Sequence, residues 1–299
     1  SIRSEKSVPI LLPLLETDNT HLQSNISKAL VSIDSSTAIT PLCNLLSSPD
    51  HNTTMTVSQI LTRMTDNTIS QKVYERFNKD HTINAPAAFV LGQKKFKNAI
   101  PELRSRLKDT SESGHDGMAE ALGWLDDRES IPLLMEVAAR KNKQGSAGAI
   151  WSLGYLKADE AIPLMVNILK KQDRQLTAPA IFALGEIGNP TTVKPLINLY
   201  YESGFQYQMQ IALSLAQIGG PKVAEILKTN MESGNPKREK MAGYMLLKSR
   251  DPSLAPYAIT LLAHPNETIR RYAMGGLKNI SGQDFNTIDE WKVWEKQQK

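Results

Sequence analysis

Hydrophobic positions in this chain follow the spacing of short amphipathic helices, and polar turns separate them at regular intervals. Ile131, Leu134 and Val137 fall on one helical stripe. After a polar turn, Ile150 and Leu153 fall on a second stripe. Because apolar residues three or four positions apart share one face of a helix, each stretch predicts an amphipathic helix. The pattern therefore predicts a helix, a short turn, a second helix and another turn.

Proline and glycine repeat with the same plan. The first helices of three successive pairs open with Ile-Pro at a 31-residue interval, at Ile100-Pro101, Ile131-Pro132 and Ile162-Pro163. Proline is tolerated in the first helical turn because its missing N–H would have no partner there. The second helices carry a glycine at one recurring position, namely Gly92, Gly123, Gly154 and Gly185. Since glycine inside a helix costs about 1 kcal/mol relative to alanine, its recurrence predicts that neighbouring helices approach closely there.

A repeat of this regularity predicts a stack of similar units rather than one globular core. We expect an all-α fold of about nine helix pairs, with residues 1–299 forming a single solenoid. Its parts are degenerate N-terminal repeats over 1–98, regular repeats over 99–282 and a C-terminal cap over 283–299. Trp291 and Trp294 are expected to face the last repeat, because a terminal repeat has to cover its outer apolar face.

Large aromatic side chains occupy two columns that follow the same period. The first column contains Phe89, Glu120, Trp151, Phe182, Leu213 and Tyr244. The second column, four residues later, contains Gln93, Trp124, Tyr155, Glu186, Gln217, Lys248 and Asn279. Positions four apart lie on the same helical face, and smaller Ala, Leu and Ile residues already fill the core stripe beside them. The polar members of both columns predict that this face meets water, although partial burial between repeats is the alternative for the rings.

Composition places further limits on the class of protein. The net charge is +4, and Lys and Arg are spread along the chain, which disfavours nucleic acid as a partner. No stretch approaches the ~20 apolar residues of a membrane helix, so we expect a soluble protein without a membrane span. We expect a cytoplasmic location by default, or an exported or envelope location if a native N-terminus before Ser1 was removed. The single cysteine, Cys43, lies in an apolar helical stretch, which predicts a buried inert thiol.

Motifs of catalysis and metal binding are missing from the sequence. It has no P-loop, no dinucleotide-binding glycine pattern, no HExxH pair and no G-x-S-x-G elbow. We therefore assign no catalytic residue, no cofactor and no metal site. His21, His51 and His81 recur every 30 residues, with His115 near the equivalent place. Residues one repeat apart cannot converge on a single metal ion, so we predict solvated turn positions for these histidines.

Two segments carry a resemblance to a known family. Ala180-Ile-Phe-Ala-Leu-Gly-Glu-Ile-Gly188 and Ala119-Glu-Ala-Leu-Gly-Trp-Leu125 match the pattern A-x-A-L-G-x-I-G. This pattern resembles the HEAT family, specifically the bacterial HEAT-like repeats named after phycobilisome lyases, and the resemblance covers nearly the whole chain. It implies a right-handed α–α superhelix whose second helices line the concave side. The Asp and Arg that HEAT repeats often carry near the start of the second helix have a counterpart only in Asn266-Glu-Thr-Ile-Arg270, so we expect apolar packing, more than a polar ladder, between repeats.

The two columns and the resemblance together favour a non-catalytic scaffold that binds a protein or peptide in a concave groove. Its expected partner-binding residues are Phe89, Glu120, Trp124, Trp151, Tyr155, Phe182, Glu186, Tyr244 and Lys248. Exposed aromatic clusters anchor protein interfaces, and acids at the groove edge would select a basic or amide-rich partner. The resemblance also leaves open a chromophore handler similar to phycobilin lyases. A third hypothesis is a DNA-binding enzyme similar to the alkylpurine DNA glycosylases built on HEAT-like repeats.

Overall fold

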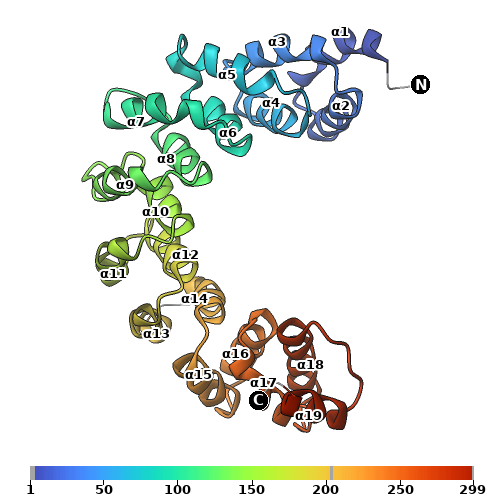
Figure 1. Ribbon diagram of the computed structural model, residues 1–299, viewed down its shortest axis with the longest axis vertical. Coiled ribbons are helices and arrows are strands. Elements are labelled where there is room, and N and C mark those ends of the chain that lie inside the picture. The colour runs from blue at the N-terminus through green and yellow to red at the C-terminus, as the bar shows by residue number, and fades with distance from the viewer. Residues whose placement is uncertain (1–3, 203–204, 298–299) are drawn as a thin grey trace. The chain divides into compact units, whose positions relative to one another are not determined.

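A computed structural model describes residues 4–202 and 205–297 of the chain (Figure 1). Every regular element within those ranges is a helix, as the repeat predicted. The chain divides into two compact units, Ser1–Leu156 (unit 1) and Lys157–Lys299 (unit 2).

Unit 1 consists of five helix pairs within its described residues. Their helices are α1 (Val8–Leu11), extended by the 3-10 turns Glu5–Ser7 and Leu12–Leu15, α2 (Thr20–Ile33), α3 (Ser36–Leu45), α4 (His51–Arg63), α5 (Ile69–Phe77), α6 (Asn84–Gln93), α7 (Ile100–Lys108), α8 (His115–Trp124), α9 (Ile131–Ala138) and α10 (Ser146–Tyr155). The even-numbered helices pack against one another in one layer, and the odd-numbered helices form a second layer (Figure 1).

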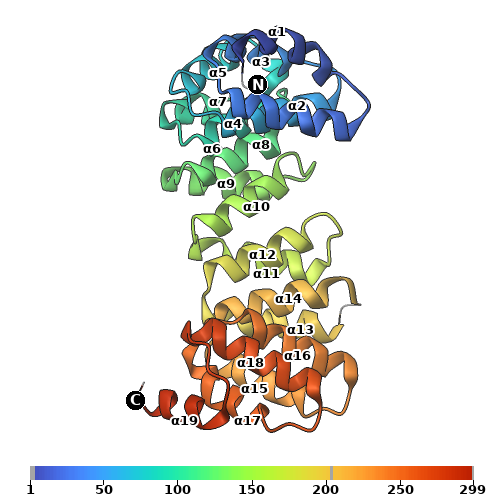
Figure 2. The ribbon, with the colours of Figure 1, turned by 90° about the vertical axis from the view of Figure 1, so that its right-hand side faces the viewer.

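Unit 2 repeats this arrangement with four helix pairs and one additional helix, again within the described residues. Its helices are α11 (Ile162–Lys171), α12 (Thr177–Ile187), α13 (Val193–Glu202), α14 (Phe205–Ile218), α15 (Pro221–Met231), α16 (Pro236–Lys248), α17 (Ala255–Leu261), α18 (Glu267–Ser281) and α19 (Ile288–Gln297). Figure 2 shows α12, α14 and α16 one below another. Nine pairs and a terminal helix confirm the predicted all-α repeat fold.

The helix starts follow from the sequence. Short 3-10 turns over Lys97–Ala99, Arg128–Ser130 and Asp159–Ala161 lead into α7, α9 and α11. Pro101 and Pro132 then lie in the first helical turn, as predicted, where proline breaks no hydrogen bond. At the other end, α12 stops at Gly188, whose φ of 73° lies in the left-handed region that glycine adopts without strain.

Three of the four recurring glycines, Gly92, Gly123 and Gly185, lie where neighbouring even-numbered helices approach closely, as predicted. A Cβ on Gly123 of α8 would lie 2.4 Å from Ser152 Oγ of α10. In unit 2, a Cβ on Gly185 of α12 would lie 2.7 Å from Ser214 Oγ of α14. The sequence did not predict the partner serines. Their hydroxyls donate to carbonyl oxygens of the neighbouring helix, Ser152 to Ala119 at 2.7 Å and Ser214 to Ile181 at 2.9 Å.

Individual polar bonds also join neighbouring pairs, in addition to the apolar packing that the sequence predicts. Asp116 of α8 accepts a hydrogen bond from the Gly148 amide of α10 at 2.9 Å. The Asn84 side chain of α6 donates to Glu112, in the turn before α8, at 2.8 Å. Asp116 and Asn84 do not recur at the equivalent positions of other repeats, whereas the serine-to-carbonyl bond of Ser152 recurs at Ser214.

The C-terminal segment caps the last pair, as expected. Helix α19 packs against α17, and Trp291 is fully buried. The Trp291 ring meets Phe285 at 4.9 Å and Trp294 at 5.9 Å between ring centroids, both edge to face. Edge-to-face rings stabilise such clusters beyond the area they bury. The two tryptophans thus belong to the packing of the terminal repeat.

Candidate functional site

The aromatic columns of unit 1 meet on the even-numbered layer. Phe89 projects from α6, Trp124 from α8, and Trp151 and Tyr155 from α10. The Phe89 and Trp124 rings lie edge to face, with centroids 5.5 Å apart. The Trp124 ring rests over Gly92, where an added Cβ would lie 2.8 Å from Trp124 Cε3. The missing side chain at Gly92 therefore makes the space in which the Trp124 ring lies.

These side chains are partly open to solvent. Tyr155 is 43% exposed, which fits the expected water-facing position. Phe89, Trp124 and Trp151 are half-buried, and the first two rings pack against each other where α6 meets α8. The columns of unit 1 thus combine the two alternatives: one ring is exposed and three are partly covered. We call Phe89, Glu120, Trp124, Trp151 and Tyr155 the aromatic face of unit 1.

Glu120 is the acidic member of the aromatic face of unit 1. Its half-buried carboxyl lies one helical turn before Trp124 on α8. Loss of hydration raises the pKa of Glu120 above its ordinary value, and the negative charge of Asp116 raises it further. The ionised form of Glu120 is therefore disfavoured in the folded protein. A cation or an amide donor on a partner would stabilise that form.

A small apolar cavity of about 250 Å³ adjoins Phe89. It lies between α4 and α6, and its lining includes Pro86 and Met55, whose side chain is 51% exposed. The sequence did not single out this cavity, because Met55 falls outside both columns. It extends the apolar surface of the even-numbered layer toward the N-terminal pairs of unit 1.

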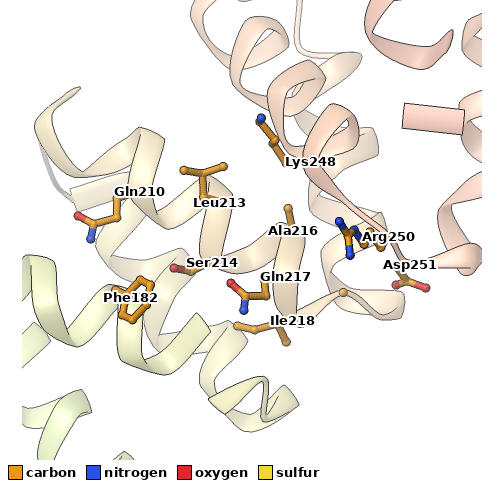
Figure 3. A pocket seen from close by; sticks show the side chains of 11 residues that line it. Phe182, Gln210, Leu213, Ser214, Ala216, Gln217, Ile218, Lys248, Arg250 and Asp251 are labelled. Atoms are coloured by element: carbon orange, nitrogen blue, oxygen red, sulfur yellow. The ribbon is translucent and has the colours of Figure 1, made fainter. Parts of the chain in front are cut away.

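In unit 2, the same columns line a larger cavity of about 720 Å³ (Figure 3). Phe182 enters it from α12, Leu213 and Gln217 from α14, and Lys248 from the end of α16. The remaining lining residues are Gln210, Ser214, Ala216, Ile218, Gly219, Arg250 and Asp251. We call this site the basic cavity of unit 2. Of the residues predicted to bind a partner, Phe182 and Lys248 line it.

Two predicted residues of unit 2, Glu186 and Tyr244, do not line the basic cavity. Both are half-buried on the same helical layer. The Tyr244 ring lies under the Lys248 ammonium, with 5.6 Å from Nζ to the ring centroid. This cation–π contact is compatible with the exposed position of the Lys248 ammonium at the cavity rim.

The charges of the basic cavity come partly from residues outside the columns. Lys248 and Arg250 are both exposed, whereas Asp251 is half-buried. Burial opposes the ionisation of Asp251, but backbone N–H groups of Gly220 and Ser253 donate to its carboxylate and hold its pKa below the ordinary value. Asp251 therefore anchors the Gly219-Gly220 turn, while the two cations leave the cavity with an excess of positive charge.

Other candidate sites contribute no reactive centre. No cluster of three or more His, Cys, Asp or Glu side chains suited to a metal ion occurs among the residues that the structure describes. His21, His51 and His81 are exposed, as predicted. His115 is a correction: it is only 3% exposed, because it opens α8 with its Nε2 2.9 Å from the Asp109 carbonyl oxygen.

Cys43 is buried in α3, as predicted. Burial raises the pKa of its thiol to about 11, although the charges of Arg76 and Lys72 oppose this shift. The thiolate is the nucleophilic form of cysteine, so Cys43 is unreactive at neutral pH.

The stacked helix pairs and their recurring close contacts define an α-helical repeat protein. A family model described as HEAT repeats matches residues 72–154 and 162–248. The matched segments make up more than half of the chain, which belongs to the HEAT-repeat family. No curated protein matches the chain. Within the described residues, no helix is both long enough and apolar enough to cross a membrane.

Two solved structures are reported among those similar to this chain. The crystal structure of an engineered protein is 17% identical, with 92% of this chain and 88% of that chain covered and a TM-score of 0.48. The structure of human deoxyhypusine hydroxylase in complex with glycerol is 15% identical, with 88% of this chain and 100% of that chain covered and a TM-score of 0.35.

Proposed function

We propose that this HEAT-repeat protein is a non-catalytic scaffold that binds a protein or peptide on its even-numbered helical layer. HEAT repeats are generally protein-interaction scaffolds, and the chain belongs to that family. The observation that carries the proposal is the aromatic face of unit 1, where Tyr155 is 43% exposed beside three half-buried rings. Aromatic side chains in partly desolvated positions are the residue type that dominates binding energy at protein interfaces.

The chemistry of the surface supports binding rather than catalysis. Trp124 is held in place by Phe89 and by the space over Gly92, so its ring is ordered before a partner arrives. An ordered anchor loses little conformational entropy on binding, which favours affinity. Glu120 adds a carboxylate that is poorly solvated in the absence of a partner. A basic or amide-rich segment would supply the missing hydrogen bonds.

Pull-down from a lysate of the source cell, with the purified chain as bait, tests this proposal. Truncation of Trp151 and Tyr155 to alanine should reduce partner capture at least about tenfold, as expected when interface anchors are removed. Tyr201→Ala is the matched control, because Tyr201 is 49% exposed but lies on the odd-numbered helix α13. Equal capture by all three variants would contradict the proposal, as would loss of capture that merely follows loss of thermal stability.

The enzymatic hypotheses and the finer assignments stay predictions. A bilin bound by the aromatic face of unit 1 would change the absorbance of phycocyanobilin on mixing, and a DNA-binding enzyme would retain DNA on a filter at low salt. Membership of the phycobilisome-lyase-type subgroup, a bacterial source and a cytoplasmic location are likewise predictions, based on sequence resemblance and composition. The scaffold proposal requires none of them.

A further inference from the structure

The basic cavity of unit 2 has a chemistry different from that of the aromatic face of unit 1. Its apolar surface comes from Phe182, Leu213 and Ile218, and Leu213 is 36% exposed. Figure 3 shows these side chains on neighbouring helices, with Lys248 and Arg250 beyond them. Its volume of about 720 Å³ lies within the range of cavities that bind small ligands or a few side chains.

Positive charge is concentrated at one side of this cavity. Lys248 ends α16, and Arg250 follows two residues later, immediately before Asp251. The Asp251 carboxylate accepts hydrogen bonds from the backbone amides of Gly220 and Ser253, which fix it in the wall. The three charges sum to +1, and both cations are exposed. The cavity therefore complements a ligand that is anionic on one side and apolar on the other.

Gln217 adds a hydrogen-bonding requirement for a ligand of this cavity. Its exposed side chain lines the cavity together with the apolar residues and the cations, and its amide offers both a donor and an acceptor (Figure 3). A peptide backbone presents the matching N–H and C=O groups. Nucleic acid fits less well, because a phosphate backbone requires a series of cations, and Glu186 lies one turn from Phe182 on the same face of α12.

We propose that the basic cavity of unit 2 binds an extended acidic peptide segment in which Asp or Glu flanks an apolar side chain. The apolar side chain lies against Phe182 and Leu213, the carboxylates pair with Lys248 and Arg250, and Gln217 bonds the peptide backbone. This inference rests on the proposed scaffold function and names the class of partner for unit 2. It also differs from the expectation that acids at the groove edge select basic partners, which concerned Glu120 and Glu186.

Selection from a displayed library of random peptides, about a dozen residues long, tests the inference with the full chain as bait. We expect enrichment of sequences that combine Asp or Glu with Phe, Leu or Ile. An enriched peptide, labelled with fluorescein, then gives Kd by anisotropy. The double variant Lys248→Glu, Arg250→Glu should weaken binding about tenfold or more, because two favourable ion pairs become repulsive.

A charge-matched control separates this site from the total charge of the protein. The double variant Arg174→Glu, Lys228→Glu has the same net charge, and both residues are exposed in unit 2 outside the cavity lining. It should bind the peptide within about twofold of the parent chain, since charges on other surfaces act only through screened fields. Leu213→Ser should weaken binding by at least about threefold, because it removes apolar surface without altering charge.

Several results would overturn the inference. Enrichment of basic or uncharged peptides would do so, and so would equal loss of binding in the two double variants. Displacement of the peptide by single-stranded DNA at similar concentration would indicate a nucleic-acid surface instead. If enriched peptides depend on Trp151 and Tyr155 but not on Lys248 and Arg250, the scaffold proposal stands and this inference fails. If no peptide is enriched while Trp151-dependent capture of a protein persists, the inference again fails alone.

Discussion

Gly123→Ala tests whether the close approach of α8 and α10 explains the recurring glycine. The new Cβ would lie 2.4 Å from Ser152 Oγ, 2.7 Å from Ser152 Cβ and 2.8 Å from Ser152 Cα. Rotation of the serine side chain relieves only the first contact, because the Cα belongs to the backbone of α10. The two helices must therefore separate, and this separation weakens or breaks the hydrogen bond from Ser152 to the Ala119 carbonyl oxygen.

The magnitude follows from opposing contributions to the free energy of unfolding. Alanine gains about 1 kcal/mol over glycine through helix propensity. Overpacking a close contact costs about 1–3 kcal/mol. Loss of the buried Ser152–Ala119 hydrogen bond costs about 0.5–1.5 kcal/mol more. Gly123→Ala should therefore destabilise the chain by about 0.5–3.5 kcal/mol, although an isolated helix would become more stable.

Urea unfolding followed by circular dichroism measures this change through the midpoint and slope of the transition. Ser152→Gly in the Gly123→Ala background removes the contacts with Ser152 Oγ and Cβ but keeps the contact with its Cα, so the double variant should recover only part of the overpacking loss. Gly185→Ala with Ser214→Gly repeats the cycle independently in unit 2, where the added Cβ would lie 2.7 Å from Ser214 Cβ. A stabilisation of about 1 kcal/mol by Gly123→Ala alone would refute the reasoning, because helix propensity would then be the only effect.

Three further predictions concern buried polar groups. Folding raises the pKa of Glu120, so its protonated form favours the folded state at low pH and its ionised form destabilises that state as pH rises. Glu120→Gln should therefore raise the Tm near pH 7 but not near pH 3.5. Equal shifts of the Tm at the two pH values would contradict this. Arg106→Met should lower the free energy of unfolding, measured in urea, by about 2–4 kcal/mol, because buried Arg106 donates to Glu102 at 2.6 Å and to Asn84 at 2.7 Å. Lys108→Met, at an exposed position of the same helix, is the control. An equal change in both variants would refute the reasoning. Iodoacetamide at about pH 8 should alkylate Cys43 at least about tenfold faster after unfolding, because burial raises the pKa of its thiol to about 11 in the folded protein. Equal alkylation rates in the folded and unfolded protein would contradict burial of Cys43.

Local sequence was sufficient to predict much of the fold and some of the candidate site. Ile-Pro at the starts of α7, α9 and α11 and apolar stripes of helical spacing indicate short helices, since both act within one or two turns. The 31-residue period adds their order along the chain, because a repeated unit can bury its apolar face only against its neighbours. The recurring glycine also predicted a close helix contact. Phe182 and Lys248, taken from the columns alone, line one cavity in unit 2.

Tertiary structure alone decided which side chains meet, how far each is buried and what charge a cavity carries. Arg250 and Asp251 lie outside both columns, yet they set the charge of the basic cavity of unit 2 because the turn after α16 comes back beside α14. Asp251 bonds the Gly220 amide 31 residues away, and His115 lies buried where its polarity predicted exposure. Periodicity determines the face of a helix on which a residue lies. The packing of neighbouring helices then determines what that face contacts, and this depends on side chains that do not repeat.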